Sequence, residues 1–477
     1  MGGALMQLVA YGAQDVFLTG TPEITFWKVS YRRHTNFAME SIEQTFNGQA
    51  DFGKRVSCTI SRNGDLAYRT YLQVTVPEIN QDIHSGDVYA RWLDFPGEQL
   101  VAQVEIEIGG QRIDRQYGDW MLTWNQMTLT SEQQKGYYKM IGNTTQLTYI
   151  TDPTFADING PCAATGGPAQ VCAPRKSLPE TTLYVPLQFW FCRNPGLALP
   201  LIALQYHEVK INLDFRPIGE CLWAVSKLNA AASEGTVSVS QAYQQSLVAA
   251  SLYVDYIFLD TDERRKMAQN PHEYLFEQLQ FTGDESVGSS SNKIKLNFNH
   301  PCKELVWVVQ PDANVDYCAS LMGDTVLYKT LGAQPFNYTD AIDALPNAVH
   351  AFGGVDATSG INAVINTSGL FTDAGAGDAT SGSTFLDTTA LSGVSDAGTF
   401  VLAETALDLH CWGENPVVTA KLQLNGQDRF SEREGSYFDV VQPFQHHTRA
   451  PDTGINVYSF ALRPEEHQPS GTCNFSR

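Results

Sequence analysis

The sequence predicts an all-β protein made of two β-sandwich halves, and three observations support this. The chain has 477 residues, which suits two domains, because single hydrophobic cores stop growing at roughly 250 to 300 residues. Short runs of alternating or β-branched residues, separated by turn dipeptides, recur from about residue 45 onward. A pattern in the first half also returns in the second half in the same order.

The strands of the first half are predicted from period-two patterns. Residues 57–61 and 68–76 flank an Asn63-Gly64-Asp65 turn and indicate a strand, a turn and a strand. Residues 101–108 (VAQVEIEI) and 208–215 (EVKINLDF) alternate between apolar and polar types, so each is expected to bury one face. Further strands of this half are predicted at 182–192 and 199–205.

One helix is predicted to interrupt the first half. Residues 120–140 are rich in Gln, Met, Leu and Lys, Asp119 is suited to the N-cap, and Gly136 weakens the end. A loop rich in Gly, Pro and Ala is expected at 159–174. Residues 228–246 are small and polar, which indicates a linker between the halves.

The second half is predicted to open with a strand at residues 252–259 (LYVDYIFL). More strands are predicted at 273–282, 293–298 and 305–309. Between residues 317 and 407 the chain is dominated by Gly, Ala, Ser, Thr and Asp, without a core-forming period. We expect this long insertion to be a loop displayed on the surface.

The repeated pattern is a strand, a tight turn, a second strand, and then a glycine near an aromatic residue. It is IEIGGQ at residues 106–111 followed by Gly118-Asp119-Trp120, and LQLNGQ at 422–427 followed by Gly435-Ser436-Tyr437. We interpret it as an internal duplication. After the matching Arg and Pro residues near 193 and 463, the first half continues with two predicted strands, whereas the second has only GTCNFSR. The second sandwich is therefore expected to lack its closing strands.

Charge and composition argue against several classes of protein. The net charge is −21, from 52 acidic and 31 basic residues. Direct nucleic-acid binding is not expected, because it depends on clustered basic side chains. No run of 18 apolar residues is present, so no membrane insertion is predicted. Nine cysteines at irregular spacing, with no CxxC pair, indicate neither a disulfide framework nor a zinc site.

We predict no catalytic, cofactor-binding or metal-binding residues. The nucleophile elbow, the phosphate-binding loop and the HExxH motif are absent. The pair His446-His447 is expected on a strand with diverging side chains, as ordinary surface or core histidines. Asp260 to Glu263 are expected in a solvated turn or helix cap rather than a calcium site. Among the Asn-x-Ser/Thr motifs, Asn337 and Asn366 lie in the insertion and are the candidate glycosylation sites.

Residues 8–48, SRNGDL at 61–66 and YSFALRPEEHQPSGTCNFSR at 458–477 closely resemble the major capsid proteins of nucleocytoplasmic large DNA viruses, of the algal and giant virus type. The insertion carries no such resemblance. The family implies a double jelly roll: two consecutive eight-stranded jelly-roll β-sandwiches with short helices and long surface loops. We accordingly divide the chain into an N-terminal inward-facing segment (1–27), a first jelly roll (28–225), a linker (226–250) and a second jelly roll (251–477).

The resemblance implies a structural protein that is not an enzyme and has no cofactor. Three chains would form a homotrimeric, pseudo-hexagonal capsomer, and neighbouring capsomers would build the icosahedral outer shell. The N-terminal segment would contact minor capsid proteins beneath the shell. The implied location is the virion capsid, with assembly in the host cytoplasm.

Two other functions are compatible with a jelly-roll sequence. One is a minor capsid or penton-type protein, which the presence of two similar halves disfavours. The other is a carbohydrate-binding jelly-roll protein, suggested by the tryptophans and the plentiful carboxylates. Most of those tryptophans lie in patterns that indicate a core, which argues against a sugar-binding surface.

Overall fold

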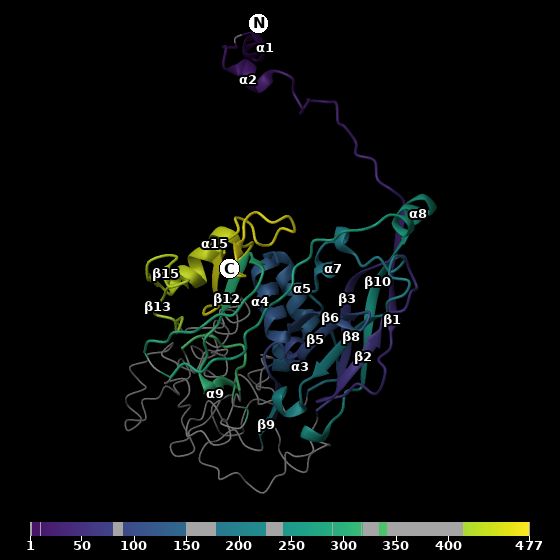
Figure 1. Ribbon diagram of the computed structural model, residues 1–477, viewed down its shortest axis with the longest axis vertical. Coiled ribbons are helices and arrows are strands. Elements are labelled where there is room, and N and C mark those ends of the chain that lie inside the picture. Colours follow the sequence, from purple (N-terminus) through teal and green to yellow (C-terminus); the bar gives the residue numbers. More distant parts are fainter. Residues whose placement is uncertain are drawn as a thin grey trace, which may run out of the picture.

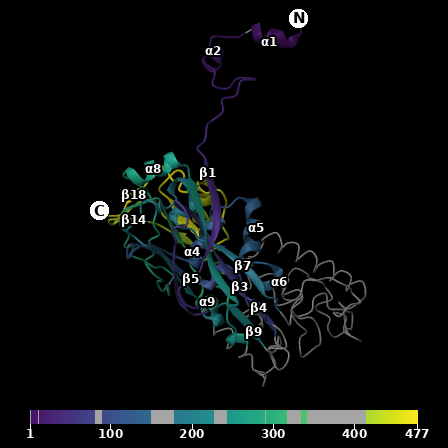
Figure 2. The ribbon, with the colours of Figure 1, turned by 90° about the vertical axis from the view of Figure 1, so that its right-hand side faces the viewer.

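The computed structural model describes residues 2–9, 11–79, 89–148, 178–225, 242–288, 290–315, 317, 333–340 and 414–476. Residues 37–259 form what we call the first unit, and residues 273–476 the second unit. The two units lie side by side, and the N-terminal segment projects away from both (Figures 1 and 2).

The first unit is a sandwich of two four-stranded antiparallel sheets. The first sheet has the order β1-β10-β3-β7, with β1 Phe37–Gln44, β10 Ala249–Leu259, β3 Leu66–Val76 and β7 Thr181–Pro186. The second has the order β2-β8-β5-β6, with β2 Arg55–Thr59, β8 Val209–Phe215, β5 Val101–Ile108 and β6 Gln111–Tyr117. A separate ladder pairs β4 Tyr89–Trp92 with β9 Leu222–Val225.

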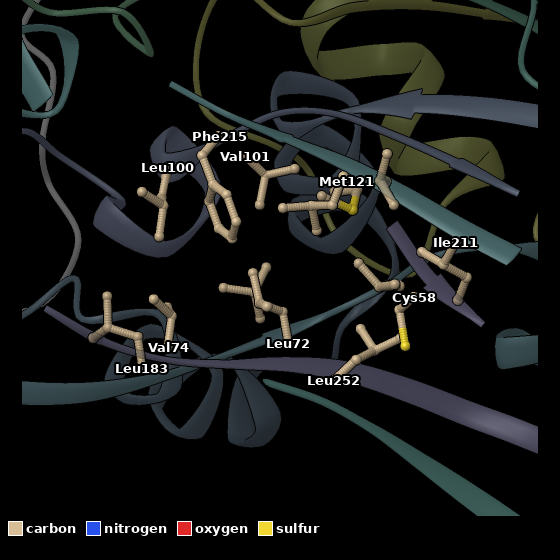
Figure 3. Close-up of a cluster of buried hydrophobic side chains, with 14 of the residues drawn as sticks. Cys58, Leu72, Val74, Leu100, Val101, Met121, Leu183, Ile211, Phe215 and Leu252 are labelled. Carbon is tan, nitrogen blue, oxygen red and sulfur yellow. The ribbon is translucent and has the colours of Figure 1, made fainter. Parts of the chain in front are cut away.

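The alternating residues of these strands make the core between the two sheets. In β8 every second residue is buried, beginning with Val209 and ending with Phe215. Leu72 and Leu252 from one sheet face Ile211 from the other (Figure 3). Burial of each such side chain contributes roughly 1.5 to 3 kcal/mol.

Strands far apart in the sequence are neighbours in both sheets, as in a jelly roll. β1 pairs with β10, and β2 pairs with β8. The predicted eight-stranded first sandwich is therefore confirmed. The prediction that residues 252–259 open the second half is wrong, because β10 is hydrogen-bonded on both sides to first-unit strands. An alternating pattern identifies a strand but not the sheet that it joins.

The predicted helix at 120–140 is two helices, α4 Gly118–Thr128 and α5 Ser131–Ile141. The chain breaks between them because Thr130 and Gln133 form a capping box that starts α5. Asp119 is not the N-cap of α4, since Tyr117 holds that position. The other first-unit helices are α3 Pro96–Leu100, α6 Thr145–Thr148, α7 Trp190–Arg193, η2 Pro195–Leu197, η3 Ile218–Glu220 and η4 Ala242–Gln244.

Two predicted strands of the first unit are shorter or absent. Residues 182–192 contain the end of β7 and then turn into α7. Residues 199–205 form turns, and Leu199 makes an isolated bridge to Ala67. Residues 187–192 and 199–201 are apolar because their side chains pack into the core without extending a sheet.

The second unit is held by short two-stranded ladders in the described residues. These are β11 Pro301–Cys302 with β18 Cys473–Asn474, β12 Glu304–Trp307 with β17 Asn456–Ser459, β13 Thr419–Ala420 with β16 Arg433–Glu434, and β14 Gln423–Leu424 with β15 Gln427–Asp428. Its helices are α9 Asp312–Val315, η6 Tyr437–Val441 and α15 Gln442–His446.

The predicted strands at 273–282 and 293–298 have no regular secondary structure and form no ladder in the structure. Side chains link these backbones instead: Gln280 Nε2 donates to Asn299 O, and Asn299 N donates to Gln280 Oε1. The prediction of a strand at 305–309 is confirmed in part by β12. Apart from residues 317 and 333–340, the predicted insertion lies outside the described residues.

The remaining elements lie at the ends of the first unit. Helices α1 Gly3–Val9 and α2 Asp15–Thr19 belong to the projecting N-terminal segment. Helix α8 Thr261–Gln269 follows β10, and Asp260 caps it by accepting a hydrogen bond from Thr261 N. The expected helix cap at Asp260 is thus confirmed.

Candidate functional site

The repeated sequence pattern folds into the same hairpin in both units. In the first unit the turn residues Gly109 and Gly110 have φ values of 60° and 83°, and in the second unit Asn425 and Gly426 have 52° and 81°. Positive φ at both central residues is typical of the two-residue turn that matches the twist of a hairpin. The two turns are thus equivalent in conformation as well as in sequence.

A glycine after each hairpin lets the backbone pass close to a carbonyl oxygen of another segment. A Cβ added at Gly118 would lie 2.2 Å from Glu98 O, and one added at Gly435 would lie 1.7 Å from Val417 O. No side chain fits at either position. Helix α4 begins at Gly118 itself, and η6 begins two residues after Gly435. Hairpin, glycine and helix therefore form one module that occurs in both units.

The module of the first unit lies at the contact between the units. Arg449 N donates to Met127 O at 3.1 Å. Gln126 and Asp452 exchange two hydrogen bonds, of 2.8 Å and 3.2 Å. Residues 449–452 of the second unit therefore run along α4, and we call this contact the seam.

Apolar residues of both units continue the seam. First-unit side chains around α3, α4 and α5 pack with three residues of the second unit in one buried cluster, which contains Phe95, Leu122, Tyr137, Tyr138, Ile141, Phe336, Tyr338 and Ile455. The rings of Phe95 and Phe336 meet edge to face with their centroids 5.5 Å apart. The seam is thus a shared core with a polar border.

A buried acid lies next to this cluster. Glu98 is fully buried and accepts a hydrogen bond of 2.5 Å from the Tyr137 hydroxyl. Burial raises the pKa of Glu98 to about 8. The carboxyl group is therefore largely protonated at neutral pH, and it serves as a hydrogen-bonding group of the core rather than as an acid exposed to a substrate.

Ion pairs extend the contact between the units. Arg193, after β7, lies over the Trp124 ring at 4.0 Å and pairs with Glu277 of the second unit at 3.4 Å. Within the second unit, Lys303 Nζ also pairs with Glu277. These contacts tie the stretch 273–282 to α4, although that stretch forms no ladder.

His447 joins two carboxylates inside the second unit. Its Nε2 lies 2.7 Å from Glu304 and its Nδ1 lies 2.9 Å from Glu465, while the side chain is fully buried. Burial alone would lower the pKa of His447, but the two carboxylates outweigh it and raise the pKa to about 9. The imidazolium form with both ring nitrogens donating is thus favoured.

The sequence prediction for the pair His446-His447 is wrong about the strand, because the pair ends helix α15. The prediction of an ordinary core histidine missed the ionised cluster. Glu304 is distant from His447 in the sequence, so no local spacing could have indicated it.

Asn337 is buried, with 6% of its surface exposed. Its Nδ2, the atom that would carry a glycan, donates to Gln334 at 2.8 Å. Its Oδ1 accepts hydrogen bonds from Thr339 N at 3.1 Å and from Thr339 Oγ1 at 2.7 Å. This position argues against glycosylation of folded Asn337. Asn366 lies outside the described residues.

The N-terminal segment exposes apolar side chains that a folded protein normally covers. Exposed large hydrophobic residues recur from Leu5 to Tyr31, and the rings of Phe17, Phe26 and Trp27 are almost entirely in solvent. The basic run Tyr31 to His34 follows directly. The segment therefore has the character of an unoccupied contact region.

Within the residues that the structure describes, no group of three or more His, Cys, Asp or Glu is placed to hold a metal ion. The same part of the chain contains no helix with the length and apolar character needed to cross a membrane.

Comparison with known proteins identifies relatives of both units. Residues 25–260 match the family described as "Major capsid protein N-terminus", and residues 263–477 match "Large eukaryotic DNA virus major capsid protein". The chain is 78% identical to the major capsid protein of Phaeocystis pouchetii virus over 481 residues, covering 100% of this chain and 91% of that protein.

Solved structures resemble it over nearly its full length. A chain from a quasi-atomic model of the PBCV-1 virus capsid matches with 34% identity and a TM-score of 0.58, covering 95% of this chain and 84% of that chain. The Faustovirus major capsid protein matches with 14% identity and a TM-score of 0.62, covering 98% of this chain and 89% of that chain. The second match concerns the fold alone.

Proposed function

Because the chain belongs to the family of large eukaryotic DNA virus major capsid proteins and has their double jelly-roll fold, we propose that three copies form one pseudo-hexagonal capsomer. Such capsomers would tile the outer shell of an icosahedral virion. The chain is a structural capsid protein, and its place is the capsid.

The observation that carries the trimer is the duplicated module in the two units. Both modules have the same turn conformation, and in both a glycine at or near the start of a helix lies against a backbone carbonyl oxygen. Three chains with two similar units each present six similar lobes around a threefold axis. A ring of six lobes packs on a flat facet with one kind of protein, which a chain with a single unit achieves only as a hexamer.

We propose that the N-terminal segment contacts minor capsid proteins beneath the shell. Its exposed apolar residues and the basic run at 31–34 support this role. The net charge of −21 supports a shell protein without direct contact with the genome. We further propose that the protein has no enzymatic activity and assembles in the host cytoplasm.

The buried tryptophans disfavour the carbohydrate-binding alternative. Trp124, Trp190 and Trp223 are each at most 6% exposed. A sugar-stacking surface needs exposed aromatic rings. The penton-type alternative is disfavoured by the match of both units to major capsid protein families.

The molar mass of the purified chain in solution, measured by light scattering after size-exclusion chromatography, tests the proposal. One chain has a mass of 52.6 kDa. We expect a stable species with the mass of three chains. A species that remains monomeric at every concentration would contradict the trimer.

A further inference from the structure

The helices of the two duplicated modules differ in what covers them. Aligned on Gly118 and Gly435, the first five positions have the same burial class in both units. Met121 and Phe438, which occupy the same place, are both 0% exposed. The inner faces of the two helical segments thus pack against their own units in the same way.

One face of the helix is buried in the first unit and exposed in the second. Thr123, Trp124 and Met127 are 5%, 6% and 0% exposed. The matching residues Val440, Val441 and Phe444 are 56%, 37% and 82% exposed. In the first unit the three positions lie on adjacent turns of α4. In the second unit, Val440 and Val441 end the π-helix η6, and Phe444 follows in α15.

The second unit contacts the C-terminal end of helix α4 in the first unit. The chain at 449–452 is hydrogen-bonded to Gln126 and to the Met127 carbonyl, and Glu277 pairs with Arg193, the first-unit residue that lies over Trp124. Within one chain, therefore, the second unit lies at the end of the buried face and binds the arginine that covers it.

The exposed face in the second unit is larger than the helix. Leu462 is 72% exposed, and its carbonyl oxygen lies 3.1 Å from His446 Nδ1 at the end of α15. We call Val440, Val441, Phe444 and Leu462 the exposed stripe. Interface centres are rich in aromatic side chains, and a large apolar side chain with this exposure is suited to be an anchor.

We infer that the exposed stripe of the second unit is the contact between copies, and that the first unit of a neighbouring chain covers it. The inference rests on the proposed trimer and names its seam. In a ring of six similar lobes, first and second units alternate, so each lobe has a neighbour of the other kind on both sides. The seam within a chain and the seam between chains are then two versions of one contact.

A second copy explains the stripe better than an unrelated partner does. The contact joins two different surfaces, so it is heterologous, and a heterologous contact closes into a ring when its rotation matches the number of copies. The duplicated modules supply the matching geometry, because the inner packing of the helix is the same in both units. Three repeats of the contact leave no stripe uncovered.

Replacement of Phe444 by Asp tests the inference in the full chain. Because Phe444 is exposed, a charge there leaves the folded subunit intact but opposes burial against a neighbour. We expect the dissociation constant of the trimer to rise at least a hundredfold, with far-UV and near-UV circular dichroism unchanged. Leu462→Asp is the second variant, and the same change is expected for it.

Tyr206→Asp is the matched control, because Tyr206 is an aromatic residue of the first unit with 94% exposure and lies outside the stripe. This variant should remain trimeric. If Phe444→Asp and Leu462→Asp both form trimers as tightly as the unmodified chain does, the inferred seam is wrong while the trimer stands. If the unmodified chain forms no trimer, the proposed function fails first and the seam with it.

Discussion

The two units share a module but are held together differently. The first unit has strands of up to 11 residues in two four-stranded sheets around one continuous apolar core. The longest ladder of the described second unit pairs two strands of four residues. Its interior is a chain of aromatic contacts, from Trp307 through Phe438 and Phe430 to Tyr458, beside the ionised His447 cluster.

This difference shows that the duplicated sequence patterns lie in units of different architecture. The first unit buries one continuous apolar core between its own sheets. The described part of the second unit contains the buried, ionised His447 cluster and makes the seam contacts with the first unit. We therefore expect truncation of the core to act mainly on the first unit, and loss of the ionised His447 cluster to act on the second.

The largest expected effect is the loss of core packing in the first unit. Leu72 is 0% exposed between the sheets, so Leu72→Ala should lower the free energy of unfolding by about 2–5 kcal/mol. Urea denaturation followed by circular dichroism measures this loss. Val418→Ala, at a position of the second unit that is 80% exposed and lies outside the exposed stripe, is the control and should change little. Equal losses of unfolding free energy in both variants would contradict the conclusion that the first unit is stabilised mainly by its core.

The next effect concerns the ionised cluster of the second unit. The pKa of His447 is raised from 6.5 to about 9 in the folded chain. Its stabilisation is therefore complete below about pH 6.5 and is lost as the pH rises through 9, a change of about 2–3 kcal/mol. We expect His447→Gln to lower stability at pH 7 and to weaken this loss at alkaline pH.

Urea unfolding at pH 7 and pH 9.5 measures the His447 effect. His446→Gln is the matched control. His446 is adjacent to His447 in the sequence, but its ring is hydrogen-bonded to the backbone carbonyl of Leu462 rather than to a carboxylate. A fall in stability between these pH values that is as large in His447→Gln as in the unmodified chain would show that the cluster contributes no such term.

The next prediction tests whether Gly118 and Gly435 are equivalent positions of the duplicated module. Gly118→Ala and Gly435→Ala should each destabilise the chain by about 1–3 kcal/mol, because the added methyl group collides with a carbonyl oxygen in either unit. Gly136→Ala is the control: it lies in α5 with no atom within 4 Å of the added Cβ. It should stabilise by about 0.5–1 kcal/mol. Thermal unfolding measures the relative stability of the three variants. If Gly118→Ala or Gly435→Ala left the stability unchanged, the two glycines would not be equivalent.

The smallest effect is expected at an exposed ion pair. Arg463 and Glu466 lie 2.9 Å apart, with both side chains more than half exposed. Arg463→Ala should therefore change stability by no more than about 0.5 kcal/mol. A loss above 1 kcal/mol in thermal unfolding would mean that exposed charges matter to the second unit as much as buried ones do.

The sequence predicted what depends on local patterns. Alternation located β5, β8 and β10, and the paired turns located the duplicated modules. It did not reveal the break between α4 and α5, because a capping box inside a helical pattern resembles the rest of the helix. It also placed β10 in the wrong half, since alternation does not identify the sheet.

Long-range contacts were beyond sequence reasoning. Glu304 and Glu465, the partners of His447, come from two separate parts of the chain. Glu98 and Tyr137, which are hydrogen-bonded to each other, are also far apart in the sequence. Residues 273–282 have the pattern of a strand, yet side-chain hydrogen bonds replace the ladder. A pattern of apolar residues predicts which face is buried but not what buries it.

Amide hydrogen exchange in the isolated subunit and in the trimer tests the central claim most directly. The claim is that one helix contact is made twice, once within a chain and once between chains. We predict slow exchange across α4 in both states, and exchange across η6 and α15 that becomes at least tenfold slower on trimer formation. Equal exchange rates for residues 437–446 in the two states would contradict the account.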